Sequence, residues 1–136
     1  MSKIKNLTAD DFDKDGNLRS LTDKQVVILF YAEFCPACRN FKPTFEQVGN
    51  KLMSNNKNII FAKVSTPDNR DLMGKIREMD LFEVMYIPTV VSYHNGSYYS
   101  TYDYDENDPE DKKTYRTAGD LEEYAKGVGK SKINFK

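Results

Sequence analysis

One uninterrupted apolar run, residues 26–32, dominates the hydrophobic pattern of the chain. Residues 26–31 of this run are aliphatic or aromatic, and a strand that is apolar on both faces is typical of the buried centre of a parallel sheet. Residues 59–64 and 89–93 predict two further strands. The dipeptide Asn95-Gly96 after the last of them is a strong hairpin signal, so residues 98–104 are expected to form the returning strand.

Between the strands, apolar residues recur every three or four positions, which predicts amphipathic helices. Residues 35–53 form the longest such segment, residues 69–79 a second, and a third begins at Thr117. Thr8 and Asp11 have the spacing of a capping box and predict a short helical turn. The residues expected to face inward from the three long segments are Phe41, Phe45, Val48, Leu52, Leu72, Ile76, Met79, Leu121, Tyr124 and Val128.

The expected order of elements is strand, helix, strand, helix, hairpin and helix. A strand–helix–strand unit requires parallel strands with a right-handed crossover, whereas the hairpin adds antiparallel strands. We therefore expect an α/β fold with a mixed central β-sheet and helices on both faces. The chain has 136 residues with no repeat and no linker, so residues 1–136 are expected to form a single domain.

Charge and composition argue against two classes of partner. The formal net charge is -1, so the chain has no overall positive field that would attract nucleic acid or an anionic membrane. The apolar run of residues 26–32 is too short to span a bilayer. Residues 1–7 lack the apolar core of a secretory signal peptide, so the expected location is the cytoplasm.

The two cysteines of the chain, Cys35 and Cys38, lie in one Cys-Pro-Ala-Cys motif between the predicted central strand and the long helix. Cys35 is therefore expected at a helix N-terminus, where free amide groups and the helix dipole favour the thiolate. Cys38 lies one turn further in and is more shielded. The asymmetry predicts that Cys35 attacks a substrate disulfide and that Cys38 resolves the mixed disulfide. Pro36 restricts the turn between them, and Arg39 is expected to add positive charge beside Cys38.

A metal site and an inert pair of core residues remain open as alternatives to redox chemistry at the motif. A zinc site needs about four ligands, and the chain has only one histidine, His94, so zinc would have to be shared between two chains. The cysteines could also be unreactive core residues. Pro36 and Ala37 at a strand–helix junction favour redox chemistry over both, with no metal and no organic cofactor.

Residues 27–38, Pro43 inside the long helix and the segment Ile87-Pro88-Thr89 resemble the thioredoxin and protein disulfide isomerase superfamily. The resemblance covers about residues 4–128 and implies a thioredoxin fold that exchanges disulfides with protein substrates. It also implies a cis peptide bond before Pro88, beside the cysteines, and a substrate strand that pairs with the backbone of Ile87. The compact chain is also similar to thioredoxin-like proteins of large DNA viruses.

The resemblance thus implies four substrate-contacting residues, which are Phe34, Pro36, Ile87 and Pro88. Phe34 stands where the family usually has tryptophan, so it keeps an apolar surface without the indole donor. The Pro36-Ala37 pair matches neither the Gly-Pro of thioredoxins nor the Gly-His of isomerase domains. The redox potential is therefore left open by the motif.

Two buried positions also depart from the family pattern. Leu29 stands where the family has a buried acid that helps to take the proton from the resolving thiol. Lys63 aligns with the lysine that pairs with this acid, so Lys63 is expected to lack its partner. Both departures would slow resolution by Cys38.

The function that the sequence favours is a thiol–disulfide oxidoreductase acting on protein disulfides or dithiols, with a reductase or a thiol oxidase as its redox partner. Reductase, isomerase and oxidase remain open. The alternative is a thioredoxin-fold binding or structural module with little turnover, for example a virion component. Leu29 favours this alternative, whereas Cys35, Cys38 and Pro88 argue against it.

Two acidic segments are weaker signals. Residues 11–18 match the opening of an EF-hand loop, but Thr22 occupies the position of the bidentate glutamate that calcium requires. Residues 103–111 are acidic and could hold a cation or a basic partner. A solvated loop is the favoured interpretation of each.

Overall fold

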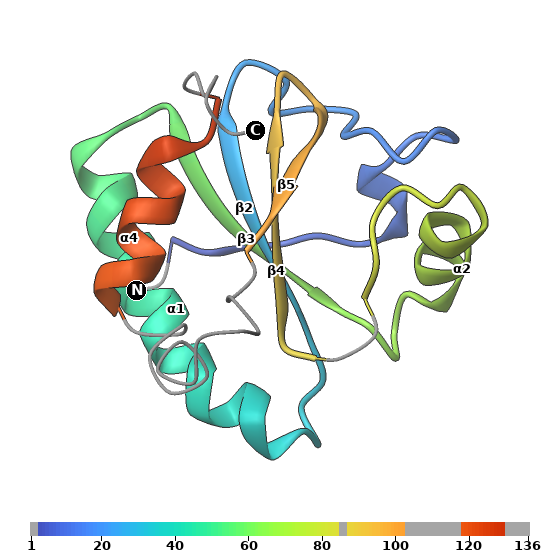
Figure 1. Ribbon diagram of the computed structural model, residues 1–136, viewed down its shortest axis with the longest axis horizontal. Coiled ribbons are helices and arrows are strands. Elements are labelled where there is room, and N and C mark those ends of the chain that lie inside the picture. The colour runs from blue at the N-terminus through green and yellow to red at the C-terminus, as the bar shows by residue number, and fades with distance from the viewer. Residues whose placement is uncertain (1–2, 85–86, 103–117, 130–136) are drawn as a thin grey trace, which may run out of the picture.

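The apolar run near the start of the chain forms the central strand of a mixed five-stranded sheet (Figure 1). The structure is a computed structural model that describes residues 3–84, 87–102 and 118–129. Strand β2, Gln25–Tyr31, pairs in parallel with β3, Ile59–Ser65, and antiparallel with β4, Thr89–His94. The expected central strand is confirmed, although only one of its two neighbours is parallel.

The two edges of the sheet are shorter. Strand β5, Ser97–Thr101, returns from β4 through Asn95 and Gly96, whose φ values of 56° and 83° are those of a tight hairpin turn. It ends before the predicted residue 104, and residues 103 and 104 lie outside the described residues. At the opposite edge, β1, Lys5–Asn6, pairs in parallel with β3. The sequence did not predict β1, because it has only two residues and both are exposed.

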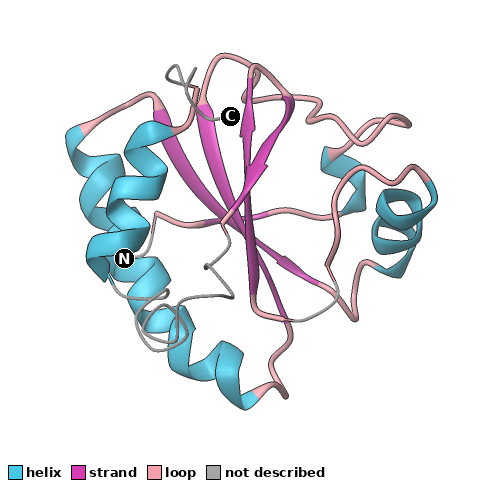
Figure 2. Cartoon of the chain, in the orientation of Figure 1, coloured by secondary structure: helices cyan, strands magenta, loops and turns pink. Residues whose placement is uncertain are grey.

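The helices cover both faces of the sheet, as expected (Figures 1 and 2). Helices α1, Pro36–Asn55, and α4, Ala118–Gly127, lie together on one face, and α2, Arg70–Glu78, lies on the other. The expected cap of α4, Thr117, lies outside the described residues. In the part of the chain that is described, no helix combines the length and the apolar character that a membrane crossing requires.

Two details near the helix ends test the sequence predictions. A 3₁₀ turn, η1, spans Ala9–Asp11, and Thr8 and Asp11 form both hydrogen bonds of the predicted capping box. Met79 was expected on the inner face of α2, but this prediction is wrong because its side chain is 39% exposed. The helix ends at Glu78, so Met79 is the C-cap residue and no longer follows the helical periodicity.

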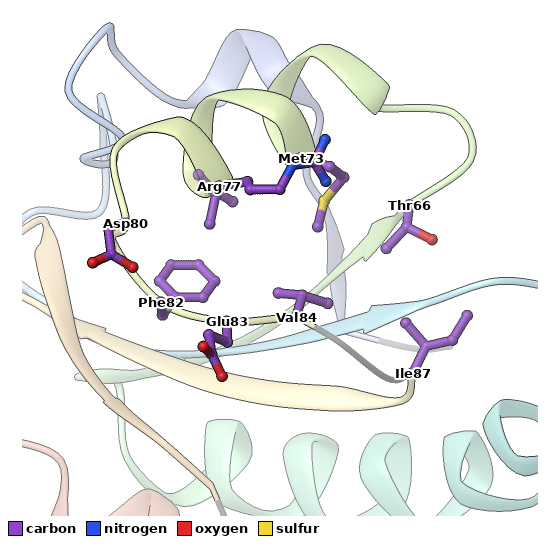
Figure 3. A pocket seen from close by; sticks show the side chains of 9 residues that line it. Thr66, Met73, Arg77, Asp80, Phe82, Glu83, Val84 and Ile87 are labelled. Atoms are coloured by element: carbon purple, nitrogen blue, oxygen red, sulfur yellow. The ribbon is translucent and has the colours of Figure 1, made fainter.

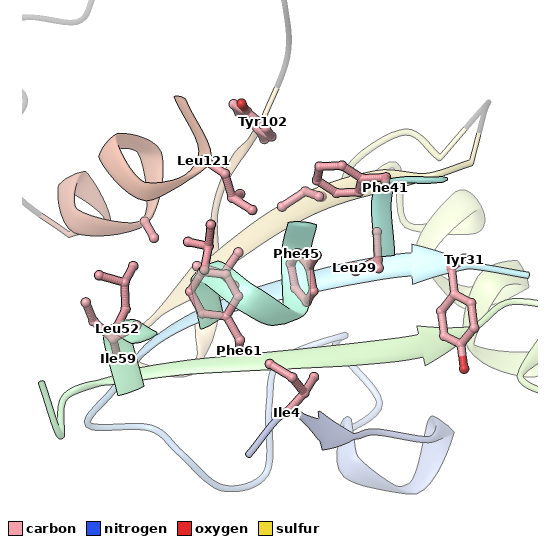
Figure 4. Close-up of a cluster of buried hydrophobic side chains, with 14 of the residues drawn as sticks. Ile4, Leu29, Tyr31, Phe41, Phe45, Leu52, Ile59, Phe61, Tyr102 and Leu121 are labelled. Atoms are coloured by element: carbon pink, nitrogen blue, oxygen red, sulfur yellow. The ribbon is translucent and has the colours of Figure 1, made fainter. Parts of the chain in front are cut away.

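Strand β2 divides the core into two clusters because its successive side chains point to opposite faces. Val27, Leu29 and Tyr31 pack with α1 and α4 (Figure 4), whereas Val26, Ile28 and Phe30 pack with α2. The first cluster also contains Cys38, so the Cys-Pro-Ala-Cys motif reaches into the core on the α1 face.

Candidate active site

Cys35 is the N-cap residue of α1, and Pro36 is the first helical residue. The Cys35 Sγ accepts a hydrogen bond from the backbone N–H of Cys38 at 3.2 Å. No acidic residue lies in the first turn of α1. The sulfur therefore sits at the positive end of a 20-residue helix, a place that stabilises a thiolate.

The two cysteines differ in accessibility, as the sequence predicted. Cys35 is half-buried and Cys38 is 1% exposed, and both are present as thiols. Cys38 packs in the buried cluster with Leu29 and Phe41. Cys35 is therefore accessible from outside, whereas Cys38 is shielded from solvent.

The second wall of the site is the segment before β4. The peptide bond between Ile87 and Pro88 is cis, which confirms the expectation for this segment. The Cys35 Sγ lies 3.7 Å from the carbonyl oxygen of Ile87, 52 residues away in sequence. Ile87 is half-buried and packs against the same cluster as Cys38. The fold thus places a backbone edge beside the sulfur of Cys35.

Phe34 is the most exposed large apolar side chain that the structure describes, with 71% of its surface exposed. It sits on a loop that two basic residues of α1 hold in place. Lys42 Nζ contacts Glu33 Oε2 at 3.1 Å, and Arg39 Nη1 donates to the backbone oxygen of Glu33 at 3.2 Å. The described side-chain contact of Arg39 is therefore with this loop, and the expected effect of its charge on Cys38 stays a prediction.

The prediction that Lys63 lacks a partner is wrong. Its Nζ lies 2.9 Å from Glu46 Oε2, and both side chains are largely shielded, with 14% and 27% of their surfaces exposed. Leu29 is opposite Lys63 in the register of β2 and β3 and is completely buried. The acid missing at position 29 is thus supplied to Lys63 by α1. Sequence reasoning missed Glu46 because Glu46 lies 17 residues away, on another element.

Tyr31 lies between two of these cations. The ring centroid of Tyr31 is 5.1 Å from Lys42 Nζ and 5.8 Å from Lys63 Nζ. Both distances are within the range of a cation–π interaction. Tyr31 therefore links the loop pair of Lys42 and Glu33 to the buried pair of Lys63 and Glu46.

The loop that resembles an EF-hand uses its Asp13 carboxylate for its own fold. Asp13 Oδ1 accepts backbone hydrogen bonds from Asp15 and Asn17 at 2.8 and 3.0 Å. The hydrogen bond from Asn17 lowers the pKa of Asp13 below its usual value. Within the described ranges, no three His, Cys, Asp or Glu residues gather as a metal site would require. The acidic segment of residues 103–111 lies outside the described residues.

Comparisons with known proteins agree with this geometry. A family model described as Thioredoxin matches residues 3–115. The chain is 38% identical to protein disulfide-isomerase A3 of Gallus gallus over 66 residues, which cover 48% of this chain and 12% of that protein. It is 39% identical to a thioredoxin of Coprinus comatus over 77 residues, which cover 55% of this chain and 67% of that protein. The chain therefore spans only a small part of the isomerase.

Solved structures show the same fold. Human ERp44 in its form I superposes with a TM-score of 0.70 at 19% sequence identity, covering 96% of this chain and 30% of that one. A thioredoxin of Malassezia sympodialis superposes with a TM-score of 0.56 at 24% identity, covering 74% of this chain and 78% of that one. The first of these superpositions covers nearly the whole of the present chain.

Proposed function

Because the chain belongs to the thioredoxin family, we propose that it is a thiol–disulfide oxidoreductase that acts on protein substrates through Cys35 and Cys38. The observation that carries the proposal is the position of one sulfur. Cys35 Sγ is 3.2 Å from the amide nitrogen of Cys38 at a helix N-terminus and 3.7 Å from the carbonyl oxygen of Ile87. A nucleophile and a backbone edge that can hold an extended substrate strand are thus adjacent.

The reaction consists of two exchanges. The Cys35 thiolate attacks one sulfur of a substrate disulfide, which forms a mixed disulfide and releases the other substrate sulfur as a thiolate. Cys38 then loses its proton and attacks Cys35 Sγ, and the first substrate sulfur leaves. The substrate gains two electrons and takes up two protons. The enzyme is left with a Cys35–Cys38 disulfide, which a reductase or another dithiol must reduce; the reverse sequence would oxidise a substrate.

The exposed side chains of Phe34 and Pro36 suit contact with a folded substrate, and Pro88 joins Ile87 to the start of β4. In this proposal, the backbone of Ile87 pairs with the substrate strand and holds its sulfur in front of Cys35. We propose a cytoplasmic location, with a virus particle as the alternative. The support is that both thiols of the chain belong to one motif and no cysteine is left for a structural disulfide.

Trapping of the mixed disulfide tests the assignment of roles. Cys38→Ser should form a covalent adduct with a disulfide-bonded protein substrate, because the first exchange proceeds and the second cannot. Cys35→Ser is the matched control and should form none. Non-reducing electrophoresis and intact mass detect the adduct, and dithiothreitol should release it. An adduct with Cys35→Ser alone would reverse the two roles.

A redox titration of Cys35 and Cys38 in glutathione buffers decides the direction of the reaction. A potential near about -270 mV is that of a reductant, and one near about -180 mV is that of an isomerase or oxidant. If neither the titration nor the trapping detects exchange, the proposal fails in favour of a binding or structural module. The complete burial of Leu29, which supplies no acid beside Cys38, is the observation that favours that module.

A further inference from the structure

A cavity of about 490 Å³ lies on the α2 face of the sheet (Figure 3). Met73 and Arg77 line it from α2, and Phe82 and Val84 line it from the segment that follows the helix. Ile87 of the candidate active site lies at one end (Figure 3). This cavity therefore adjoins the site already described and is not separate from it.

A second hollow, the α4 pocket, lies on the other face of the sheet and has a volume of about 410 Å³. The last turns of α1, one side of α4 and the first residues of β2 and β3 line it. Lys51 in its lining is 16 residues beyond Cys35. This separation corresponds to roughly 24 Å along α1, at about 1.5 Å per residue. A molecule in the α4 pocket would therefore not touch the cysteines.

The inner wall of the α4 pocket is apolar and its rim is polar. Leu52 and Ile59 line it and are buried, with 4% and 2% of their surfaces exposed. Lys51, Asn55 and Lys126 line the same pocket and are exposed. Its volume falls within the range of about 300–1,000 Å³ that is usual for small-molecule sites. The pocket thus offers both an apolar and a charged surface to one small molecule.

One carboxylate at the rim holds two lysines. Lys51 Nζ lies 3.1 Å from Glu122 Oε1, and Lys126 Nζ lies 3.0 Å from Glu122 Oε2. Hydrogen bonds from Lys126 and Lys51 lower the pKa of Glu122 below its usual value, so this carboxylate is ionised at neutral pH. Because two ammonium groups face one carboxylate, the described lining of the pocket has an uncompensated positive charge.

The two lysines keep hydrogen-bonding capacity for an incoming group. More than half of each side chain is exposed, 60% for Lys51 and 58% for Lys126. An ammonium group has several N–H donors, and Glu122 uses only part of them. Since each lysine contacts a different oxygen of Glu122, the two ammonium groups are held at a spacing that the oxygens of a second carboxylate can also match.

The charge of the pocket favours an occupant with a single negative charge. One carboxylate on the ligand would balance the excess positive charge, whereas a phosphate dianion would exceed it. The C-terminal end of α1 also borders the pocket, and the negative end of the helix dipole opposes any further negative charge there. Phosphate esters are therefore disfavoured relative to carboxylic acids.

We propose that the α4 pocket binds a small carboxylic acid with an aliphatic or aromatic body. The carboxylate of the ligand lies between Lys51 and Lys126, and its body packs on Leu52 and Ile59. This is a binding site, and it takes no part in the thiol chemistry. The inference goes beyond the proposed function and does not depend on it, because the pocket and the cysteine site share no residue.

Three probes separate the charge of the ligand from its apolar body. Phenylacetate has both, acetate has the carboxylate without the ring, and 2-phenylethanol has the ring without the charge. Each is titrated into the full-length protein and followed by backbone amide chemical shifts in NMR spectra. Phenylacetate should saturate with a dissociation constant of about 1–5 mM, as expected for a ligand of its size, and the other two should bind about 10-fold more weakly.

Three lysine variants test the charged rim. Lys51→Gln and Lys126→Gln each remove one ammonium group from the pocket and should weaken phenylacetate binding about 5-fold. Lys57→Gln removes the same charge from an exposed residue near the end of α1 but outside the lining, so it should leave the dissociation constant unchanged. Equal weakening in all three variants would mean attraction by the overall charge, and would overturn the proposal.

Two asparagines provide a matched test in which no ion pair is broken. Asn55→Asp puts a negative charge on the rim and should weaken phenylacetate binding about 3-fold. Asn58→Asp makes the same change at an exposed residue outside the lining and should have a smaller effect. An equal or larger effect of Asn58→Asp would contradict the proposed position of the carboxylate.

The chemical shifts also locate the ligand. The largest changes should fall on Asn55, Glu122 and Lys126. Changes centred on Phe82 in the cavity of the α2 face, 2-phenylethanol binding as tightly as phenylacetate, or no saturation by phenylacetate would each overturn the inference. Cys35→Ser should bind phenylacetate as the wild type does, because the pocket is far from Cys35. Failure of this inference therefore leaves the proposed exchange activity standing, and the reverse also holds.

Discussion

The two faces of the sheet have different contents. On the face covered by α1 and α4, the core holds Cys38 and the pair of Lys63 and Glu46 lies beside it. On the α2 face, the core includes aromatic side chains, and the Phe82 ring there stacks on that of Tyr98 with 4.8 Å between the ring centroids, next to the open cavity. Ile87 contacts both regions, because it packs against the cluster on the α1 face and lines the cavity on the α2 face.

This difference suggests a division of work across the sheet. Changes beside the cysteines on the α1 face alter the thiol chemistry, so they should affect every substrate alike. Changes on the α2 face leave Cys35 and Cys38 in place, so they should leave that chemistry unaltered. Measurements of stability and of the resolution rate can separate the two faces, and measurements on the ion pair of Lys63 and Glu46 sharpen the description of the α1 face.

The largest difference is expected in stability. Phe45 is completely buried and its ring packs on Phe61, so Phe45→Ala should lower the free energy of unfolding by about 3–5 kcal/mol. Phe82→Ala should cost less, about 2 kcal/mol, since the Phe82 ring already borders the cavity. Urea unfolding measures both. Losses of equal size would mean that the α2 face is packed as tightly as the α1 face.

An intermediate effect is expected from an acid introduced at position 29. Leu29 lies opposite Lys63 in the sheet register and in the same cluster as Cys38, so Leu29→Asp would place a buried carboxyl within that cluster. Burial raises the pKa of a carboxyl, which allows it to take the Cys38 proton near neutral pH. We expect Leu29→Asp to resolve a mixed disulfide about 10-fold faster at pH 7, although it lowers stability.

Leu29→Asn is the matched control, because it has nearly the same shape and cannot accept the proton as a carboxylate does. Stopped-flow rates of resolution, measured against pH, distinguish the two variants. The gain should be the same for all peptide substrates, since position 29 is on the α1 face. If Leu29→Asp resolves the mixed disulfide no faster than the wild type, then the lack of an acid at position 29 does not limit resolution.

The smallest effect concerns the ion pair that replaces that acid. Glu46→Gln leaves the shielded Lys63 without its carboxylate and should lower stability by about 1 kcal/mol. Glu33→Gln breaks the pair with Lys42, in which Glu33 is 70% exposed, and should cost less than about 0.5 kcal/mol. Urea unfolding measures both.

The ion pair of Lys63 and Glu46 can also be tested by its energetic coupling to position 29. In the Leu29→Asp variant, Lys63 gains a nearby second carboxylate, so Glu46→Gln should cost less there than in the wild type. A double-mutant cycle of these two changes measures the difference. Strict additivity would indicate that Asp at position 29 does not reach Lys63.

Much of the fold follows from local patterns. The apolar run became β2, the three-to-four periodicity became α1 and α2, and Asn95-Gly96 became the turn between β4 and β5. These signals are local because the spacing of apolar residues within a single strand or helix already shows which side of that element is buried. Strand β1 was missed because two exposed residues have no period, and Met79 was misplaced because the helix ends before it.

The sequence by itself also determined where the two cysteines lie. A strand that ends at Tyr31, a short turn and a helix that starts at Pro36 put the thiol at a helix N-terminus whatever the rest of the fold, and Cys38 follows one turn later. The resemblance to thioredoxins added the cis bond before Pro88. The residue types and their spacing were enough for these features, because the contacts within the motif span only three residues.

Only the tertiary structure decided what surrounds that centre. It brought Ile87 to Cys35, gave Lys63 a partner in Glu46 and assembled the cavity from α2, the segment after it and Ile87. Periodicity shows which side of each element is buried, but it does not show which side chains of two elements meet. That depends on how the elements pack, and packing sets the distances on which an ion pair, a hydrogen bond or a cavity depends.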